Sequence, residues 1–162
     1  MINVGVDTYS SLTDLKALLT HHGRDFSAYD NEAIEVAARK AALWLDGEYG
    51  ARYPGKPTQG RAQALGWPRV GVVDPQGYAV ATDEIPAEMK IAQAEAAWRI
   101  LTGADLAPDQ DNGRVVTERT VGPISTKYAE PTGPRKVRVQ AIDGILSRLF
   151  VVAKPTATFK GF

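Results

Sequence analysis

Two adjacent histidines are the first residues of this chain whose chemistry stands out. His21 and His22 lie close to Asp25, and imidazole together with carboxylate can hold a zinc ion or orient a nucleophile. Adjacent residues on a helix point in different directions, so the two rings are poor ligands for one ion. We therefore expect neither a metal site nor a catalytic histidine at this position.

The other signatures of catalysis are missing from the sequence. It contains no phosphate-binding glycine loop, dinucleotide fingerprint, zinc-protease helix motif or nucleophile elbow. It also contains no cysteine, which excludes disulfides, thiolate metal sites and cysteine nucleophiles. The paired carboxylates of Asp83 and Glu84 are typical of the start of a helix. The sequence thus predicts a protein that is not an enzyme and that holds no cofactor and no metal.

Basic and aromatic side chains alternate in the long connection between residues 48 and 83. Tyr53 and Trp67 are interleaved there with four basic residues, which are Arg52, Lys56, Arg61 and Arg69. This mixture suits a single-stranded nucleic-acid platform, in which charges hold phosphates and rings stack on bases. It also suits a protein-binding loop, where Tyr, Trp and Arg are enriched. The spacing favours the protein-binding interpretation. The whole chain has 19 basic and 19 acidic residues, and this balance argues against a domain that binds duplex DNA.

Residues 63–69, with the sequence QALGWPR, are the most distinctive part of that connection. Gly66 and Pro68 argue against a helix or a strand, and a Pro/Gly-rich connection with an aromatic anchor is typical of a binding loop. The alternative is that Trp67 folds back into the core of its own domain. Both hold together if Trp67 fixes the loop while its polar neighbours face a partner.

The elements that position this loop are predicted to be helices. Ser11 with Asp14 resembles a capping box at the start of a first helix, which Gly23 ends. Asp30 or Asn31 caps a second helix, and its apolar stripe runs from Ile34 to Leu45. We expect Gly47 to end this second helix and Trp44 to lie in the core.

A third helix opens with Asp83-Glu84-Ile85-Pro86 and ends at Gly103. It is apolar on more than one side, which predicts either a central position in a bundle or burial against another subunit. A fourth helix covers the apolar residues from Ile142 to Leu149. One domain, of residues 1–150, accommodates these helices within a chain of 162 residues.

The segment between the last two helices predicts a β-hairpin at about residues 114–128. Its β-branched, alternating stretches meet at a turn formed by Gly122 and Pro123. A small basic cluster that contains Arg135 and Lys136 follows. Residues 151–162 favour an extended C-terminal arm, whose Phe159 and Phe162 are suited to docking into a partner. No signal peptide or membrane-spanning run is predicted.

The order of these features resembles the head–tail connector, or adaptor, proteins of long-tailed bacteriophages. The resemblance runs from about Leu12 to Phe150 and is most specific at Gln63, Leu65 and Trp67-Pro68-Arg69. A closely similar group is described as DnaT-like single-stranded-DNA-binding proteins. The resemblance implies a mainly α fold of about four helices, with the hairpin and the C-terminal arm, that assembles into a homo-oligomeric ring.

A connector of this kind implies a structural role in the virion neck after synthesis in the host cytoplasm. Its ring of roughly twelve copies would bind the portal protein and a stopper or tail-completion protein, and genomic double-stranded DNA would pass through it. The expected partner contacts are Gln63, Leu65, Trp67, Pro68, Arg69, Gly122, Pro123, Phe159 and Phe162. The other implied function is single-stranded-DNA binding in replication. Candidate DNA contacts for it are Arg52, Lys56, Arg61, Arg135 and Lys136.

Overall fold

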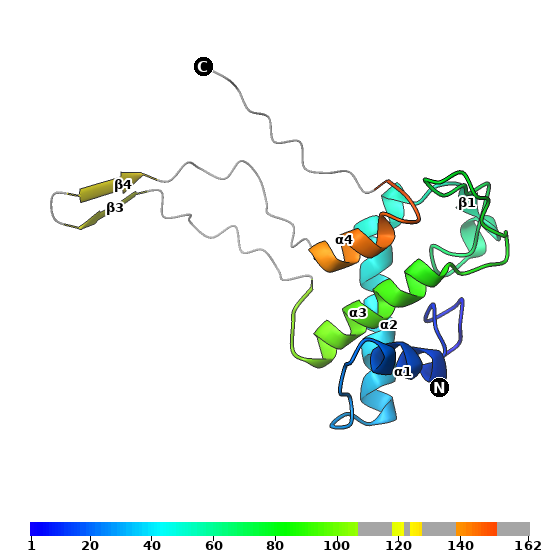
Figure 1. Ribbon diagram of the computed structural model, residues 1–162, viewed down its shortest axis with the longest axis horizontal. Helices are drawn as coiled ribbons and strands as arrows, with labels where there is room; N and C mark the ends of the chain where they lie inside the picture. The colour runs from blue at the N-terminus through cyan, green and yellow to red at the C-terminus, as the bar shows by residue number, and fades with distance from the viewer. Residues whose placement is uncertain (107–117, 122–123, 128–138, 152–162) are drawn as a thin grey trace, which may run out of the picture. The chain divides into compact units, whose positions relative to one another are not determined.

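The computed structural model describes residues 1–106, 118–121, 124–127 and 139–151 (Figure 1). The chain divides into two compact units. The first comprises Met1–Leu106 together with the described residues from Val139 onward. The second is Ala107–Arg138, of which only the two strands are described. The sequence had placed the hairpin within one domain of residues 1–150, whereas the contacts divide it from the helices.

The first unit is built from four α-helices, as the sequence predicted. These are α1 (Leu12–His21), α2 (Asn31–Tyr49), α3 (Ala87–Leu101) and α4 (Gln140–Leu146). Helix α3 is central and packs against each of the other three (Figure 1). Met89, Ala92 and Ala96 of α3 are completely buried. Neighbouring helices of the same chain therefore account for the two-sided apolar pattern of α3, and no second subunit is needed to explain it.

Side-chain caps fix the starts of the first two helices. The Ser11 hydroxyl accepts a hydrogen bond from the backbone N–H of Asp14 at 3.1 Å, and the Asp30 carboxylate accepts one from the N–H of Ala33 at 2.7 Å. Both caps confirm the prediction. Each satisfies a backbone donor that the first turn of a helix leaves without a partner.

The predicted end of α2 at Gly47 is wrong, because the helix continues to Tyr49. The Tyr49 side chain is buried, and its hydroxyl donates to the Asp143 carboxylate of α4 at 2.7 Å. These tertiary contacts offset the low helix propensity of one glycine, which costs about 1 kcal/mol. Helix α3 begins at Ala87, after Pro86, and Gly103 follows its last turn with a φ of 87°.

The connection between α2 and α3 is ordered by short elements of its own. They are the 3₁₀ turns η1 (Gly50–Arg52) and η2 (Gly60–Ala62) and the strands β1 (Lys56–Pro57) and β2 (Arg69–Val70). β1 and β2 pair in the antiparallel sense. Contacts inside one chain therefore hold the connection in place.

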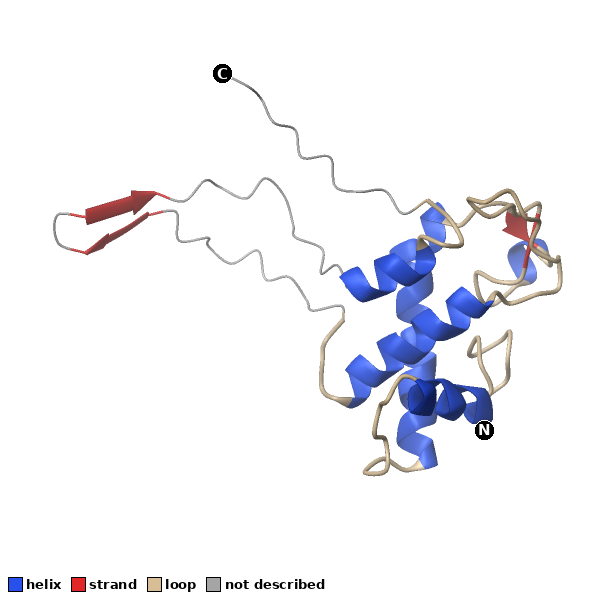
Figure 2. Cartoon of the chain, in the orientation of Figure 1, coloured by secondary structure: helices blue, strands red, loops and turns tan. Residues whose placement is uncertain are grey.

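The second unit contains the predicted hairpin. Strands β3 (Glu118–Val121) and β4 (Ile124–Lys127) are antiparallel (Figure 2). Their register pairs Glu118 with Lys127. The predicted turn residues Gly122 and Pro123 lie outside the described residues. So do Arg135, Lys136, Phe159 and Phe162, together with residues 152–162 of the predicted arm.

Candidate functional site

Residues 63–69, the loop motif, pack into the core of their own unit. The Trp67 side chain has an exposed fraction of 0%. Its ring meets the edge of the Tyr53 ring, with 5.8 Å between the centroids, and Tyr53 in turn meets Phe150. The Trp67–Pro68 peptide bond is cis. Of the two alternatives for Trp67, the structure shows the one in which it fills the core.

The Arg69 guanidinium is bound by backbone carbonyls. Its Nε donates to the carbonyl oxygen of Pro54 at 2.6 Å, and its two terminal nitrogens donate to Gly66 at 3.0 Å and Gly55 at 2.9 Å. Arg69 is only 8% exposed, and this burial lowers the pKa of its guanidinium. The charge therefore joins residues 53–55 to the loop motif and is not free to hold a phosphate.

The polar groups of Gln63 are also used inside the loop. Its amide nitrogen donates to the carbonyl oxygens of Leu65 at 2.7 Å and Pro68 at 3.0 Å. The Leu65 side chain packs against the core. Trp67 and Arg69 are buried, whereas Gln63, Leu65 and Pro68 are only partly buried. The expected partner contacts of these five residues stay a prediction, and within one chain their side chains build the loop.

A carboxylate on α2 gathers three donors from distant parts of the chain. The Asp46 carboxylate accepts hydrogen bonds from the Tyr9 hydroxyl, the Tyr53 hydroxyl at 3.1 Å and the backbone N–H of Gly66 at 2.8 Å. Tyr9 lies 37 residues before Asp46, and no spacing in the sequence indicated the pair. This Asp46 network ties the N-terminal turn, α2 and the loop motif together.

The two phenols of the Asp46 network are held neutral. Burial is the main cause that raises the pKa of both Tyr9 and Tyr53, and the nearby Asp46 carboxylate raises them further. A phenol that already donates to a partly buried carboxylate, and whose pKa is raised, is a poor general acid. The network therefore acts as a structural fastening.

Gly66 stands at the closest approach between the loop motif and the Asp46 network. A Cβ at this position would lie 2.5 Å from a ring carbon of Tyr53 and 2.9 Å from an Asp46 carboxylate oxygen. Both neighbours are fixed by their own contacts, so neither can move aside cheaply. The glycine is therefore required by the packing of the loop motif.

A family model described as "Putative DnaT-like ssDNA binding protein" matches residues 1–160 of this chain. The chain belongs to that family. No curated protein and no solved structure gives a significant match. The family description agrees with the second group that the sequence resembles and with the single-stranded-DNA-binding alternative.

In this member of the DnaT-like family, the candidate DNA contacts differ in whether their charges are already paired within the chain. Arg52 forms an ion pair with Glu48 at 3.0 Å, and its guanidinium lies 4.6 Å from the centre of the Tyr49 ring. Lys56 and Arg61 are exposed and form no ion pair with any described residue. Of the three candidate DNA contacts that the structure describes, only Lys56 and Arg61 are therefore open to a phosphate.

Acidic residues lie next to the exposed lysine and arginine. The Thr58 hydroxyl donates to the carbonyl oxygen of Thr82 at 2.7 Å, which brings residues 82–84 alongside residues 56–61. Asp83 and Glu84 follow at once, and both are exposed. Their negative charge opposes the binding of a polyanion at this surface.

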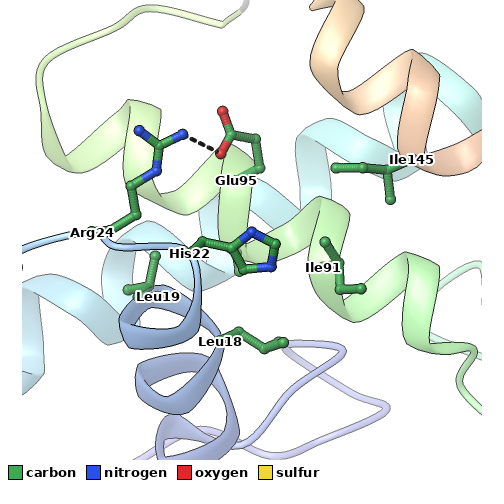
Figure 3. A pocket seen from close by; sticks show the side chains of 8 residues that line it. Leu18, Leu19, His22, Arg24, Ile91, Glu95 and Ile145 are labelled. Atoms are coloured by element: carbon green, nitrogen blue, oxygen red, sulfur yellow. Dashed lines mark hydrogen bonds and ion pairs between the residues drawn. The ribbon is translucent and has the colours of Figure 1, made fainter.

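The histidines do not form a metal site in the part of the chain that the structure describes, where no group of three or more candidate ligands occurs. His22 lines a small pocket together with residues of α1 and α3 and with Ile145 of α4 (Figure 3). Arg24 and Glu95, which form an ion pair at 2.9 Å, belong to the same lining. The pocket volume of about 20 Å³ accommodates one water molecule. Among the described helices, none has the length and apolar character needed to span a membrane.

Proposed function

We propose that this member of the DnaT-like ssDNA binding protein family is an assembly protein, the head–tail connector (adaptor) of a tailed bacteriophage. The observation that carries the proposal is the internal position of the residues that a strand-binding platform would expose. Tyr53 is 6% exposed and Trp67 is 0% exposed, so neither ring offers a face to a nucleic-acid base. The Arg69 charge is used by carbonyl oxygens of its own loop.

The exposed surface of the helical unit supports the same proposal. It carries large apolar side chains that no described residue covers, among them Leu43 at 74% exposure and Tyr78 at 73%. Such side chains are typical of surfaces that bind proteins when they occur beside polar residues. The sequence resemblance to connectors supplies the setting. There the partners are further copies in a ring of roughly twelve, the portal protein and a stopper or tail-completion protein.

A balanced charge is compatible with the DNA channel that a connector ring would line. Attraction between basic side chains and phosphates grows with each contact and would retain the genome rather than let it pass. The chain has a formal net charge of zero. We accordingly propose transient contact with genomic double-stranded DNA, a location in the virion neck after synthesis in the host cytoplasm, and no catalytic activity.

Imaging of assembled phage particles tests the connector proposal directly. We expect density for this chain between the portal vertex and the tail, and peptides from it in purified virions. Particles that lack the gene product should have filled heads without attached tails. Purified virions that contain none of the chain would refute the proposal, whatever its behaviour in solution.

Single-stranded-DNA binding is the second candidate, and the family description favours it. Fluorescence anisotropy with a labelled oligonucleotide at about 50 and 200 mM salt would detect such binding through its salt dependence. Lys56→Ala with Arg61→Ala should abolish it, while Arg148→Ala, at an exposed arginine after α4, serves as the matched control. The connector proposal expects weak binding that the paired change leaves unaltered.

A further inference from the structure

Strands β3 and β4 form a two-stranded sheet, and no third described strand joins it (Figure 1). An isolated two-stranded hairpin is at best marginally stable in water, and three or more strands are needed for independent stability. The outer edge of each strand carries backbone donors and acceptors with which another strand can pair. The described part of the hairpin therefore offers two open edges to a strand from another chain.

The register within the hairpin sets opposite charges together and apolar residues together. Glu118 lies opposite Lys127, and Val121 lies opposite Ile124. Opposite charges or apolar residues that face each other across antiparallel strands stabilise a sheet, whereas like charges destabilise it. This pattern of charge along the two strands selects the strand that each open edge can accept.

Pairing between like edges of two copies would lose both matches when all four residues of each strand are aligned. Two antiparallel β4 strands would set Lys127 opposite the apolar Ile124, and two parallel ones would set Lys127 opposite Lys127. Two β3 strands would set Glu118 opposite Val121 or opposite a second Glu118. A β4 strand parallel to a β3 strand also sets a charge opposite an apolar residue at both ends. The antiparallel pairing of β4 with β3 is the one that keeps both matches.

We propose that β4 of one copy adds to β3 of a second copy, so that the hairpins of successive copies form one continuous antiparallel sheet. Lys127 of one copy would lie opposite Glu118 of the next, and Ile124 opposite Val121, in the register found inside each hairpin. In such strand addition, backbone hydrogen bonds supply affinity and the residues that face each other supply specificity. The occupant of the open β4 edge is thus a second copy of this chain, whose β3 strand carries the complementary residues.

The contact is heterologous, because a β4 edge meets a β3 edge. Each added copy leaves one edge of either kind free, so the sheet continues until it closes as a ring or extends as a filament. Closure removes every open edge and with it the tendency to pair with other chains. The inference rests on the proposed function, since a connector ring requires a contact between copies.

Single introduced cysteines test the register between copies. The chain contains no cysteine, so each introduced thiol is unique. Thr120 lies opposite Ser125 inside the hairpin, and in the proposed sheet it also lies opposite Ser125 of the neighbouring copy. Opposed residues have Cα atoms about 5 Å apart, which a disulfide can span. Equal positions of adjacent copies are two strands apart, roughly 9–10 Å, and are too distant for a disulfide.

Chains with Thr120→Cys are mixed with an equal amount of chains with Ser125→Cys under mild oxidation, and the products are separated without reductant. We expect disulfide-linked dimers in the mixture and none with either variant alone. Thr20→Cys, at an exposed position of α1, replaces Ser125→Cys in the control mixture, which should give no dimer. Dimers of a single variant would show that like edges pair, and a mixture without dimers would show that the strands do not meet in this register. Either result overturns the inference.

Charge reversal provides an independent test of the same contact. Glu118→Lys and Lys127→Glu each set like charges opposite one another between copies and should weaken self-association, measured by sedimentation velocity, about fivefold. An equimolar mixture of the two variants should restore it, because each copy then meets the opposite charge on its neighbours while the like charges within each hairpin remain. Asp83→Lys, which reverses an exposed charge of the helical unit, is the matched control and should associate as the unaltered chain does.

Three results of the charge reversals contradict the inference. They are an unaltered chain that stays monomeric at its highest soluble concentration, single variants that associate as strongly as the unaltered chain, and a mixture that associates as weakly as the single variants. If these results occur but the chain is found in the virion neck, the ring uses other surfaces and only the inference is wrong. If the cross-links and the restored association appear but virions lack the chain, the contact between copies stands and the connector proposal is wrong.

Discussion

Replacing Asp46 by asparagine tests whether the Asp46 network fastens the loop motif to the helices. The change keeps the size of the side chain but replaces one carboxylate oxygen with an NH₂ group, which cannot accept a hydrogen bond. One oxygen of Asp46 accepts from the Tyr9 and Tyr53 hydroxyls, and the other accepts from the N–H of Gly66. One orientation of the amide sets its NH₂ group against the N–H of Gly66. The other turns the NH₂ group toward the two phenol oxygens, which can accept from it, but both phenols then lose the carboxylate to which they donate.

The expected loss of stability can be estimated from these three hydrogen bonds. A hydrogen bond to a charged group contributes about 1.5–3 kcal/mol, and a buried donor left without a partner costs about 1–3 kcal/mol. Asparagine retains one acceptor without its charge, so we expect Asp46→Asn to lower the free energy of unfolding by about 3 kcal/mol. This is a large share of the roughly 5–15 kcal/mol of a typical domain, yet most of the protein should remain folded.

Urea denaturation followed by circular dichroism of the helices measures this loss. With a slope of about 2 kcal/mol per molar urea, a loss of about 3 kcal/mol moves the midpoint down by about 1.5 M. Asp83→Asn is the matched control, because Asp83 is exposed and forms no ion pair with a described residue. If both variants shift the midpoint by the same small amount, the Asp46 network does not stabilise the fold and the reasoning is refuted.

Three further predictions concern the same unit. The pKa of Tyr9 and of Tyr53 is raised in the folded protein, so above pH ~10 the unfolded chain loses these protons first. The free energy of unfolding should therefore keep its full value below that pH and fall above it by about 1.4 kcal/mol per pH unit for each tyrosine. Tyr9→Phe should remove one of these two contributions when urea denaturation is repeated at alkaline pH. Arg69→Lys should lower the free energy of unfolding, measured by thermal denaturation, by about 2 kcal/mol, because one ammonium group cannot reach three separate carbonyls. A decrease no larger than that of a substitution at an exposed position would contradict the role assigned to Arg69. Ser11→Ala should cost about 1 kcal/mol by the same assay, and Ser11→Asp, which keeps an acceptor, should restore it.

Local signals made the helices predictable. Ser11 and Asp30 cap α1 and α2 because their side chains reach backbone donors three residues away, a relation visible in the sequence itself. Gly47 misled for the opposite reason. The low helix propensity of glycine is a local signal. The hydrogen bond that stabilises α2 beyond Gly47 joins Tyr49 to Asp143, which lies 94 positions away in the sequence.

The candidate site was predictable in its place but not in its role. Gly66, Trp67 and Pro68 marked the loop motif as unusual, and the structure confirms that this segment is neither a helix nor a long strand. The direction in which Trp67 points depends on Asp46 and on the core that α2 and α3 form. Such long-range packing leaves no periodic trace in a single sequence.

The loop motif shows why the most distinctive residues of a chain need not be the ones that bind a partner. A long connection must satisfy many backbone groups without a helix or a wide sheet, and Arg69 does so by donating to the carbonyls of Pro54, Gly55 and Gly66. Trp67 supplies the buried area that holds such a connection against the core. The outer side of the same unit carries the exposed Leu43 and Tyr78 side chains. Substitutions inside the loop motif should therefore act first on folding, and substitutions on the outer side should act on assembly with folding unchanged.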